Sequence, residues 1–373
     1  MNDLVFVNHI NLFGLDPNIL RSNQFNEYLT LYRGWVKPGV EYICPRDRPF
    51  EFDLPFDCLP TQYPLPDFPC NKLNFDDIFD QFGEKIVTKL NSDCKVYLLW
   101  SGGIDSTIIA TSILKNLGAR TFENLYIVLN QESIDENPVF FYRFLQDKNI
   151  IQYNEFCKLN LDTDNSLVLT GEGGDQIFGH SIGNKILSQD PVLAASPWRS
   201  NIDTLKKFFD SYSTPGFWDL FYDIMRCSIA KSHARIETVY DFAWWLNYNF
   251  KFDSVMYRTP LILFPELVAS QRADYYNKVI LNAFAELPIQ QWSISAGSEE
   301  KIGKTKKSFK YAGKYYIYEF DRNEHYFKEK RKEWSLPAAP SPVIALDKNF
   351  QIYSFSNRST RQTIQKIFNP TCK

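Results

Sequence analysis

The chain contains few of the residues that build metal centres or disulfide frameworks. Its 373 residues include seven cysteines, four histidines and three methionines. The cysteines are scattered, odd in number and never spaced as Cys-x-x-Cys, which argues against structural zinc, iron–sulfur clusters and a set of disulfides. The histidines show no spacing typical of metal ligands, so each is interpreted as an ordinary surface or core residue.

Long apolar runs and a strong charge of either sign are also missing. No stretch is apolar over the roughly 20 residues that a membrane-spanning helix requires, and the N-terminus lacks a basic-then-apolar signal pattern. The net charge is -3 and no domain is basic, which argues against nucleic acid as a partner. With 44% hydrophobic residues the chain can bury a substantial core. We therefore expect a cytoplasmic protein without a membrane partner.

The full Walker pattern for binding phosphate does not occur, but another glycine-rich turn does. Residues 101–106 read Ser-Gly-Gly-Ile-Asp-Ser, between an apolar strand predicted over residues 96–100 and a helix predicted from Asp105. Two glycines let the backbone turn tightly and bring N–H groups against an anion, and the positive end of the helix adds to the attraction. The alternative is a plain strand-to-helix turn in which Asp105 caps the helix.

This turn offers side chains for a magnesium nucleotide. Ser101 and Ser106 can donate hydroxyl groups, and Asp105 is a natural Mg²⁺ ligand. The sequence resembles the PP-loop of the N-type ATP pyrophosphatases, which split ATP into AMP and pyrophosphate. The resemblance implies ATP and Mg²⁺ as ligands. It assigns ATP or pyrophosphate binding to Ser101, Gly102, Gly103, Asp105 and Ser106, and also to Leu99 and Leu129, in the strands predicted over residues 96–100 and 125–129.

A second motif narrows the resemblance. Residues 170–179 read Thr-Gly-Glu-Gly-Gly-Asp-Gln-Ile-Phe-Gly and follow another apolar strand. They resemble a signature of asparagine synthetase that is shared by β-lactam synthetases and lasso-peptide cyclases. The resemblance implies that Thr170 and Gly171 line the nucleotide site, that Glu172 is catalytic, and that Asp175 is catalytic and holds substrate or metal. Gln176 replaces the family's second acid. The alternative is an exposed acidic loop.

Two lysines near the C-terminus extend the resemblance. Lys332, within Lys-Arg-Lys-Glu, matches the family lysine that offsets charge on the α-phosphate during transfer. Lys314 matches a lysine that precedes it in the family, so both are candidate catalytic residues, with a solvated helix face as the alternative for Lys314. Residues 255–260 resemble a third family segment, which makes Arg258 a candidate for binding a substrate carboxylate.

Two further segments allow more than one interpretation. Residues 299–314 contain six lysines, and we interpret them first as a solvated loop; a lid over phosphate and a patch for a polyanion are the alternatives. Residues 131–136 follow the second predicted strand, where the family holds adenine. Ser133 and Asp135 are candidates there by position, and a plain acidic loop is the alternative.

Strands and helices are predicted to alternate after residue 74. Helices are expected over residues 74–90, 105–117 and 138–146, and strands over 96–100, 125–129, 151–155 and 167–170. This order predicts an α/β fold with a parallel sheet flanked by helices, Rossmann-like, with ligands at the carboxyl ends of the strands. Proline-rich residues 1–73 are expected to form an irregular arm, residues 74–196 the α/β core, and residues 197–373 a mostly helical part of the same synthetase-like domain.

The resemblance implies an ATP-dependent ligase that adenylates a carboxylate and transfers the acyl group to ammonia or an amine. The family's glutaminase is not expected here, because Asn2 stands where that domain exposes a cysteine. The nitrogen would come from free ammonia, a separate glutaminase subunit or an amine, and the carboxylate from a small molecule or a peptide. A PP-loop enzyme that adenylates a nucleobase and a non-catalytic relative that binds a partner remain alternatives.

Overall fold

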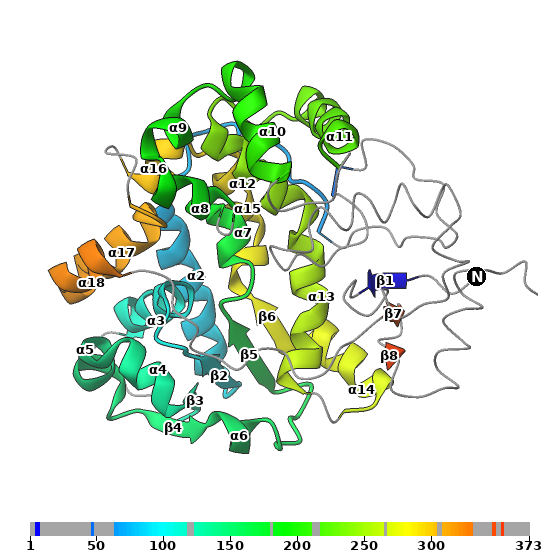
Figure 1. The fold of residues 1–373 in the computed structure, drawn as a ribbon. Helices are drawn as coiled ribbons and strands as arrows, with labels where there is room; N and C mark the ends of the chain where they lie inside the picture. The colour runs from blue at the N-terminus through cyan, green and yellow to red at the C-terminus, as the bar shows by residue number, and fades with distance from the viewer. Residues whose placement is uncertain are drawn as a thin grey trace, which may run out of the picture.

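The computed structural model describes residues 4–7, 46–47, 63–117, 123–179, 182–210, 217–264, 267–303, 308–330, 345–347 and 352–353. Within these ranges a parallel sheet is covered by helices, and a mostly helical part lies against one end of it (Figure 1). The α/β fold with a parallel sheet is therefore confirmed. Among the described residues, no helix has both the length and the apolar composition to cross a bilayer.

Five parallel strands form the sheet in the order β4–β3–β2–β5–β6. They are β2 (Lys95–Leu99), β3 (Leu125–Leu129), β4 (Asn149–Gln152), β5 (Ser166–Thr170) and β6 (Ile280–Asn282). The chain starts in the middle, adds two strands on one side, and then returns to add two on the other. Ligands of open α/β sheets bind where the strand order reverses, here between β2 and β5. Both glycine motifs begin at this point.

Two details of the sheet differ from expectation. The strand expected over residues 151–155 ends at Gln152, because Tyr153–Phe156 turn into the short helix α6. Strand β6 was not expected at all, since it lies in a segment interpreted as helical. It is three residues long, and so short an apolar run does not distinguish a strand from a buried helical turn.

Side chains alternate between two apolar clusters, one on each face of the sheet. Val96 and Leu98 of β2 enter the larger cluster together with α2 (Phe75–Asn91) and α3 (Ile104–Leu117). Tyr97 of the same strand enters the smaller cluster on the other face. Burial on both faces explains why the strands are almost uninterrupted apolar runs.

Short helices complete the α/β core. The helix expected over residues 138–146 is confirmed, although its second half is a π-helix. The elements are α4 (Gln131–Glu136), α5 (Pro138–Phe140), the π-helix Phe141–Leu145 and α7 (Gly174–Phe178).

The helical part begins after α7 and packs around a buried aromatic stripe on α12 that includes Trp244, Trp245 and Tyr248. Its helices are α8 (Ile182–Gln189), α9 (Pro191–Ala195), the 3-10 helix Trp198–Asn201, α10 (Ile202–Asp210), α11 (Phe217–Lys231), α12 (Val239–Phe250), α13 (Phe252–Leu263), α14 (Ala269–Asp274), the π-helix Tyr275–Val279, the 3-10 helix Ala283–Ala285, α15 (Leu287–Ser295), α16 (Ser298–Ile302), α17 (Tyr311–Asp321) and α18 (Glu324–Glu329).

The N-terminal arm touches the helical part at Arg46. This buried guanidinium lies over the rings of Tyr248 and Phe252, 4.6 and 4.5 Å from their centroids. It also donates to the backbone carbonyl of Tyr63 at 2.6 Å and to Oε1 of Gln290 at 2.9 Å. These contacts fix the segment around Arg46 against α12, α13 and α15.

The ends of the chain contain strands that were not expected. Leu4–Val7 (β1) pairs antiparallel with Ala345–Asp347 (β7), which pairs with Ile352–Tyr353 (β8), and the three lie together in Figure 1. The arm is thus not wholly irregular, and the C-terminal part is not wholly helical. The strands are two to four residues long, too short for an alternating pattern to be recognised.

The helices α2 and α3 approach so closely that Gly83 has no room for a side chain. A Cβ atom there would lie 2.0 Å from the backbone oxygen of Ser112. We expect Gly83→Ala to push the helices apart and to lower the free energy of unfolding by about 2 kcal/mol, measured by urea denaturation. Gly297→Ala is the control, because nothing lies within 4 Å of that Cβ position, and it should change stability by less than about 0.5 kcal/mol. Equal stability of both variants would contradict the prediction.

Candidate functional site

The loop after β2 is held at both ends and wedged against α4. The backbone N–H of Trp100 donates to Val128 at 2.9 Å, and its indole donates to Oγ1 of Thr107 in the first turn of α3 at 3.2 Å. Gly102 has φ +74°, which residues with a side chain rarely adopt. A Cβ atom there would lie 2.3 Å from the backbone oxygen of Ser133. The expected tight turn is confirmed at this glycine.

The two serines of the loop hydrogen-bond to each other and to the backbone. Their Oγ atoms are 3.1 Å apart, the N–H of Ser101 donates to Oγ of Ser106 at 3.1 Å, and Oγ of Ser106 donates to the carbonyl of Gly103 at 3.1 Å. The N–H of Gly103 donates to Oγ of Ser101 at 3.3 Å. A phosphate entering the loop would exchange these internal bonds for bonds to its own oxygens, while the first N–H groups of α3 have no acceptor within the helix.

Glycines of the second motif allow the two motifs to touch. A Cβ atom on Gly174 would lie 2.3 Å from Cγ of Asp105, and one on Gly171 would lie 3.1 Å from Cβ of Asp105 and from the N of Ser106. Any side chain at Gly174 would therefore displace the Asp105 carboxylate. The loops predicted to form one site are brought together by the structure.

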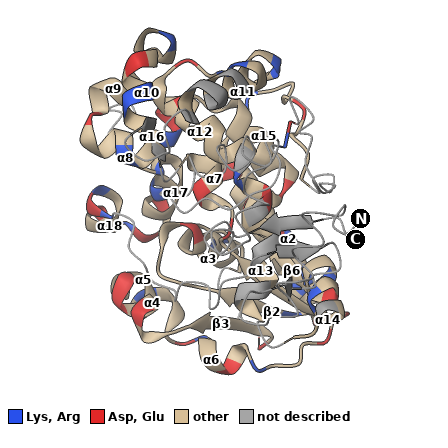
Figure 2. Cartoon of the chain, turned by 45° about the vertical axis from the view of Figure 1, so that its right-hand side comes forward, with Lys and Arg blue, Asp and Glu red and all other residues tan. Residues whose placement is uncertain are grey.

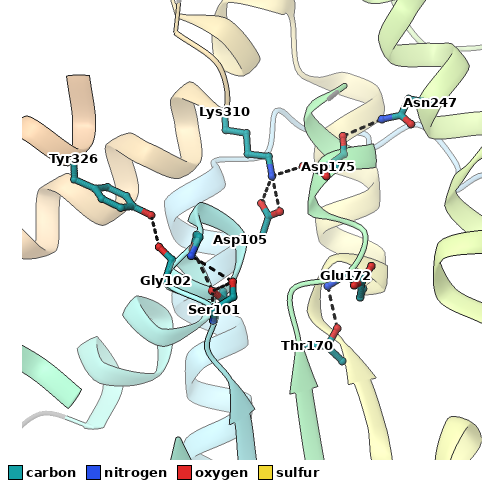
Figure 3. A network of polar contacts seen from close by, with 11 residues as sticks. Ser101, Gly102, Asp105, Thr170, Glu172, Asp175, Asn247, Lys310 and Tyr326 are labelled. Atoms are coloured by element: carbon teal, nitrogen blue, oxygen red, sulfur yellow. Dashed lines mark hydrogen bonds and ion pairs between the residues drawn. The ribbon is translucent and has the colours of Figure 1, made fainter. Parts of the chain in front are cut away.

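Lys310 connects the carboxylates of both motifs (Figure 3). Its Nζ lies 2.6 and 2.5 Å from the two carboxylate oxygens of Asp105 and 2.7 Å from Oδ1 of Asp175. The lysine side chain is only 4% exposed. Burial would lower the pKa of its amine, but the two carboxylates hold that pKa above its ordinary value. Lys310 is therefore an ammonium ion at neutral pH.

The rest of the second motif is fixed by neighbouring elements. Oγ1 of Thr170 accepts from the N–H of Glu172 at 2.9 Å and donates to Oδ1 of Asn282 on the unexpected strand β6 at 3.2 Å. Asn247 of α12 donates to the carbonyl of Asp175 at 3.1 Å. Gln176 is buried, so the position where the family has a second acid does not face solvent.

Helix α18 and the residue after it contact the loop after β2 and its surroundings through side chains to which the sequence assigned no role. The Tyr326 hydroxyl donates to the carbonyl of Gly102 at 3.1 Å (Figure 3). Lys330, which follows the helix, forms a buried ion pair with Glu136, 3.1 Å between Nζ and Oε1. That glutamate lies next to the loop, since a Cβ atom on Gly103 would be 3.4 Å from its Oε1. Only the tertiary contact identifies these residues, because lysine and glutamate are common everywhere in the chain.

The interpretation of residues 299–314 as a solvated loop is wrong for the described lysines. Lys301, Lys310 and Lys314 are all buried, because α16 and α17 pack Ile302 and Ile317 into the core beside them. The solvated alternative for Lys314 is wrong for the same reason. The other three lysines of the segment, Lys304, Lys306 and Lys307, lie outside the described residues.

Lys301 and Lys314, which have no carboxylate at contact distance within the described ranges, have lowered pKa values. The Lys301 ammonium lies 3.3 Å from the ring centroid of Trp244, and burial lowers its pKa to about 7 although Asp241 and Glu300 attract the charge. Burial lowers the pKa of Lys314 to about 8, against a smaller attraction from Glu329.

Several residues predicted to belong to the site contact their own helix or the core in the structure, and others lie outside the described residues. Ser133 forms a capping box with Asn130 at the start of α4, and Asp135 is exposed and accepts from Gln131. Leu99 and Leu129 have side chains buried in the core, so only their backbone could face a nucleotide. Lys332 lies outside the described residues, and so does the side chain of Arg258 on α13.

The carboxylates of Asp105 and Asp175 fit a magnesium ion that binds together with phosphate. Lys310 already places a positive charge between them, which shows that the two side chains can share one cation. Among the described residues, no three potential metal-binding side chains come together. Mg²⁺ typically uses one or two carboxylates plus phosphate oxygens and water, so two carboxylates are sufficient.

The chain matches no protein-family model, and no curated protein is similar to it in sequence.

Burial of the Lys314 amine predicts a pH-dependent stability. Its pKa falls from 10.5 to about 8 on folding, so between these values the unfolded chain binds more protons and stability rises with pH. At pH 7 the desolvated charge costs about 3 kcal/mol. We expect Lys314→Met to raise the free energy of unfolding at pH 7, with a gain that shrinks towards pH 10. Urea denaturation across this range is the measurement.

Lys89→Met is the matched control, because Lys89 is exposed on α2. Its free energy of unfolding should follow that of the unmodified protein at every pH. A Lys314→Met variant that is less stable at pH 7, or whose gain does not depend on pH, would contradict the prediction.

Proposed function

We propose that the protein is an ATP-dependent carbon–nitrogen ligase that activates a carboxylate as an acyl-adenylate. The observation that carries the proposal is the meeting of two glycine motifs at the reversal of the strand order, where Asp105 and Asp175 share one cation. A switch point at the carboxyl ends of parallel strands is where such folds bind nucleotides. The similarity of both motifs to asparagine synthetase supports the same reaction.

The loop after β2 would bind the pyrophosphate end of ATP. The backbone at Gly102 and Gly103 and the first turn of α3 present N–H groups and the positive end of a helix dipole. The hydroxyls of Ser101 and Ser106 already lie inside this turn. Asp105 and Asp175 would hold Mg²⁺, which when bound supplies positive charge to the phosphates. The α-phosphorus would then remain accessible to the second substrate.

The chemistry would proceed in two substitutions. A carboxylate oxygen of the substrate attacks the α-phosphorus, the bond to the bridging oxygen of pyrophosphate breaks, and an acyl-adenylate remains. Ammonia or an amine then attacks the acyl carbon, AMP leaves with the electron pair of the carbon–oxygen bond, and the nitrogen loses a proton. Glu172, at the carboxyl end of β5, would accept that proton or orient the nucleophile.

Two lysines would offset the charge of the transferred phosphoryl group. A buried amine such as Lys314, which has no carboxylate at contact distance in the described part of the chain, would gain from an incoming phosphate because the anion would offset its desolvation. For Lys332 the support comes from Lys330, which is anchored to Glu136 beside the loop. Two residues of chain span at most about 7 Å, so the proposed role at the phosphates is within the reach of a lysine.

The proposed substrates are a small-molecule or peptide carboxylate, with Arg258 as a candidate to bind it, and ammonia or an amine. A separate glutaminase subunit is a possible source of ammonia. We propose a cytoplasmic location, where ATP is supplied. Acidic and basic segments are interspersed over the described elements (Figure 2), which favours these substrates over a nucleic acid.

The non-catalytic alternative also has a specific observation in its favour. Lys310 forms ion pairs with both carboxylates, as expected if a relative had kept the fold and lost the metal. Such a protein would bind a partner and form no AMP. Measuring AMP release separates the two functions directly.

Exchange of labelled pyrophosphate into ATP tests the reaction. Amino acids and dicarboxylic acids are screened as substrates. We expect pyrophosphate exchange only when a suitable carboxylate is added, and we expect AMP, not ADP, as the product. Asp105→Asn should reduce exchange about 100-fold, because the variant loses a charge that would hold the metal. Asp147→Asn, an exposed acid in a turn, is the control and should retain full exchange. Formation of ADP and orthophosphate would refute the ligase.

Lys332→Ala tests the proposed cation at the α-phosphate. The variant should reduce pyrophosphate exchange by about 100-fold while ATP still binds, since the lysine would act on charge that develops during transfer. Nucleotide binding is followed by calorimetry with an ATP analogue that has a methylene between the α and β phosphorus atoms. Lys328→Ala, an exposed lysine on α18, should leave exchange unchanged. Full activity of Lys332→Ala would remove this lysine from the mechanism.

A further inference from the structure

Lys310 has a backbone conformation and a position that local preferences oppose. Its φ of 52° and ψ of 45° are left-handed, which is uncommon for a residue with a side chain. It is also the N-cap of α17, where the helix dipole disfavours a cation. When local preferences are violated in this way, a tertiary contact or a function maintains the residue.

The tertiary contact is the one with Asp105 and Asp175. A lysine ammonium has three donors, and three carboxylate oxygens from these two residues lie 2.5 to 2.7 Å from Nζ. The Lys310 ammonium thus resembles a bound metal cation in its positive charge, its oxygen neighbours and its burial. A second cation cannot occupy the same oxygens while the ammonium is there.

The charges show what could replace it. The formal charges of these three groups, two carboxylates and one ammonium, sum to −1. A divalent cation would neutralise the pair and prefers oxygen ligands. Its arrival would release the ammonium of Lys310, and the anionic phosphates proposed to bind at the neighbouring loop are the nearest new partner for that charge.

We propose that Lys310 is the counter-ion of Asp105 and Asp175 in the ligand-free protein and competes with a divalent cation for the two carboxylates. The inference rests on the proposed function only in that the cation is the one that enters with ATP. It assigns Lys310 a positioning role: the lysine holds the two motifs together before the nucleotide binds and turns to the phosphates afterwards. Free divalent cation should therefore bind weakly, and more tightly with nucleotide.

Binding of Mn²⁺ alone tests the competition. Electron paramagnetic resonance of free Mn²⁺ gives the dissociation constant for the unmodified protein, for Lys310→Met and for Lys115→Met. We expect Lys310→Met to bind Mn²⁺ about tenfold more tightly and to melt at a higher temperature when Mn²⁺ is added. Lys115→Met is the control, because Lys115 also contacts a carboxylate, Asp80 at 2.5 Å, away from the loops. Unchanged or weaker Mn²⁺ binding by Lys310→Met would overturn the proposal.

A measurement on the unmodified protein keeps the proposal testable if Lys310→Met does not fold. Pulses of acetic anhydride followed by mass spectrometry report how accessible each amine is. With saturating Mn²⁺, acetylation of Lys310 should become about fivefold faster, while that of Lys115 stays constant. Acetylation of Lys310 that does not accelerate would show that the metal does not displace it.

The outcomes separate this inference from the proposed function. Neither measurement uses turnover or a carboxylate substrate. If Mn²⁺ displaces Lys310 but pyrophosphate exchange is never found, the competition stands and the ligase proposal fails. If exchange occurs while Mn²⁺ affinity is the same in Lys310→Met, the ligase stands and the role given to Lys310 is refuted.

Discussion

The ion contact of Lys310 with Asp105 and Asp175 is the interaction on which the arrangement of the site depends. It joins three segments that are far apart in the chain: the loop after β2, the loop after β5 and the start of α17. Without a cation, two carboxylates held this close would repel each other or one would take up a proton. The contact between the start of α17 and the two loops therefore depends on the charges of these three side chains.

The pKa values of three buried lysines in one segment differ according to whether a carboxylate lies within contact distance. Lys310 has two carboxylates and a raised pKa. Lys301 and Lys314 have no carboxylate at contact distance among the described residues, and their pKa values are lowered to about 7 and 8. Such amines reduce stability, because their charged forms lose hydration without full compensation. A buried amine of this kind would gain free energy from an anion brought within contact distance, and that gain would appear only on binding.

The sequence predicts the structural features that depend on residues close together in the chain. It does not predict the features that depend on contacts between residues far apart in the chain. The loop at residues 101–106 and the alternation of strands and helices follow from local patterns, and the structure confirms both. Strand β6 is too short for its pattern to be read, yet Asn282 at its end supports Thr170. Lys310 could not be chosen among six lysines, since what distinguishes it is the carboxylates it contacts, 205 residues away in the case of Asp105.

The four glycines of the second motif fall into two pairs, which differ in the part of the structure that lies against them. Gly171 and Gly174 are required because the loop after β2 lies against them. Gly173 and Gly179, both with positive φ, are required because Met256 and Trp244 of the helical part lie against them. The motif therefore fixes the helical part on one side and the Asp105 carboxylate on the other.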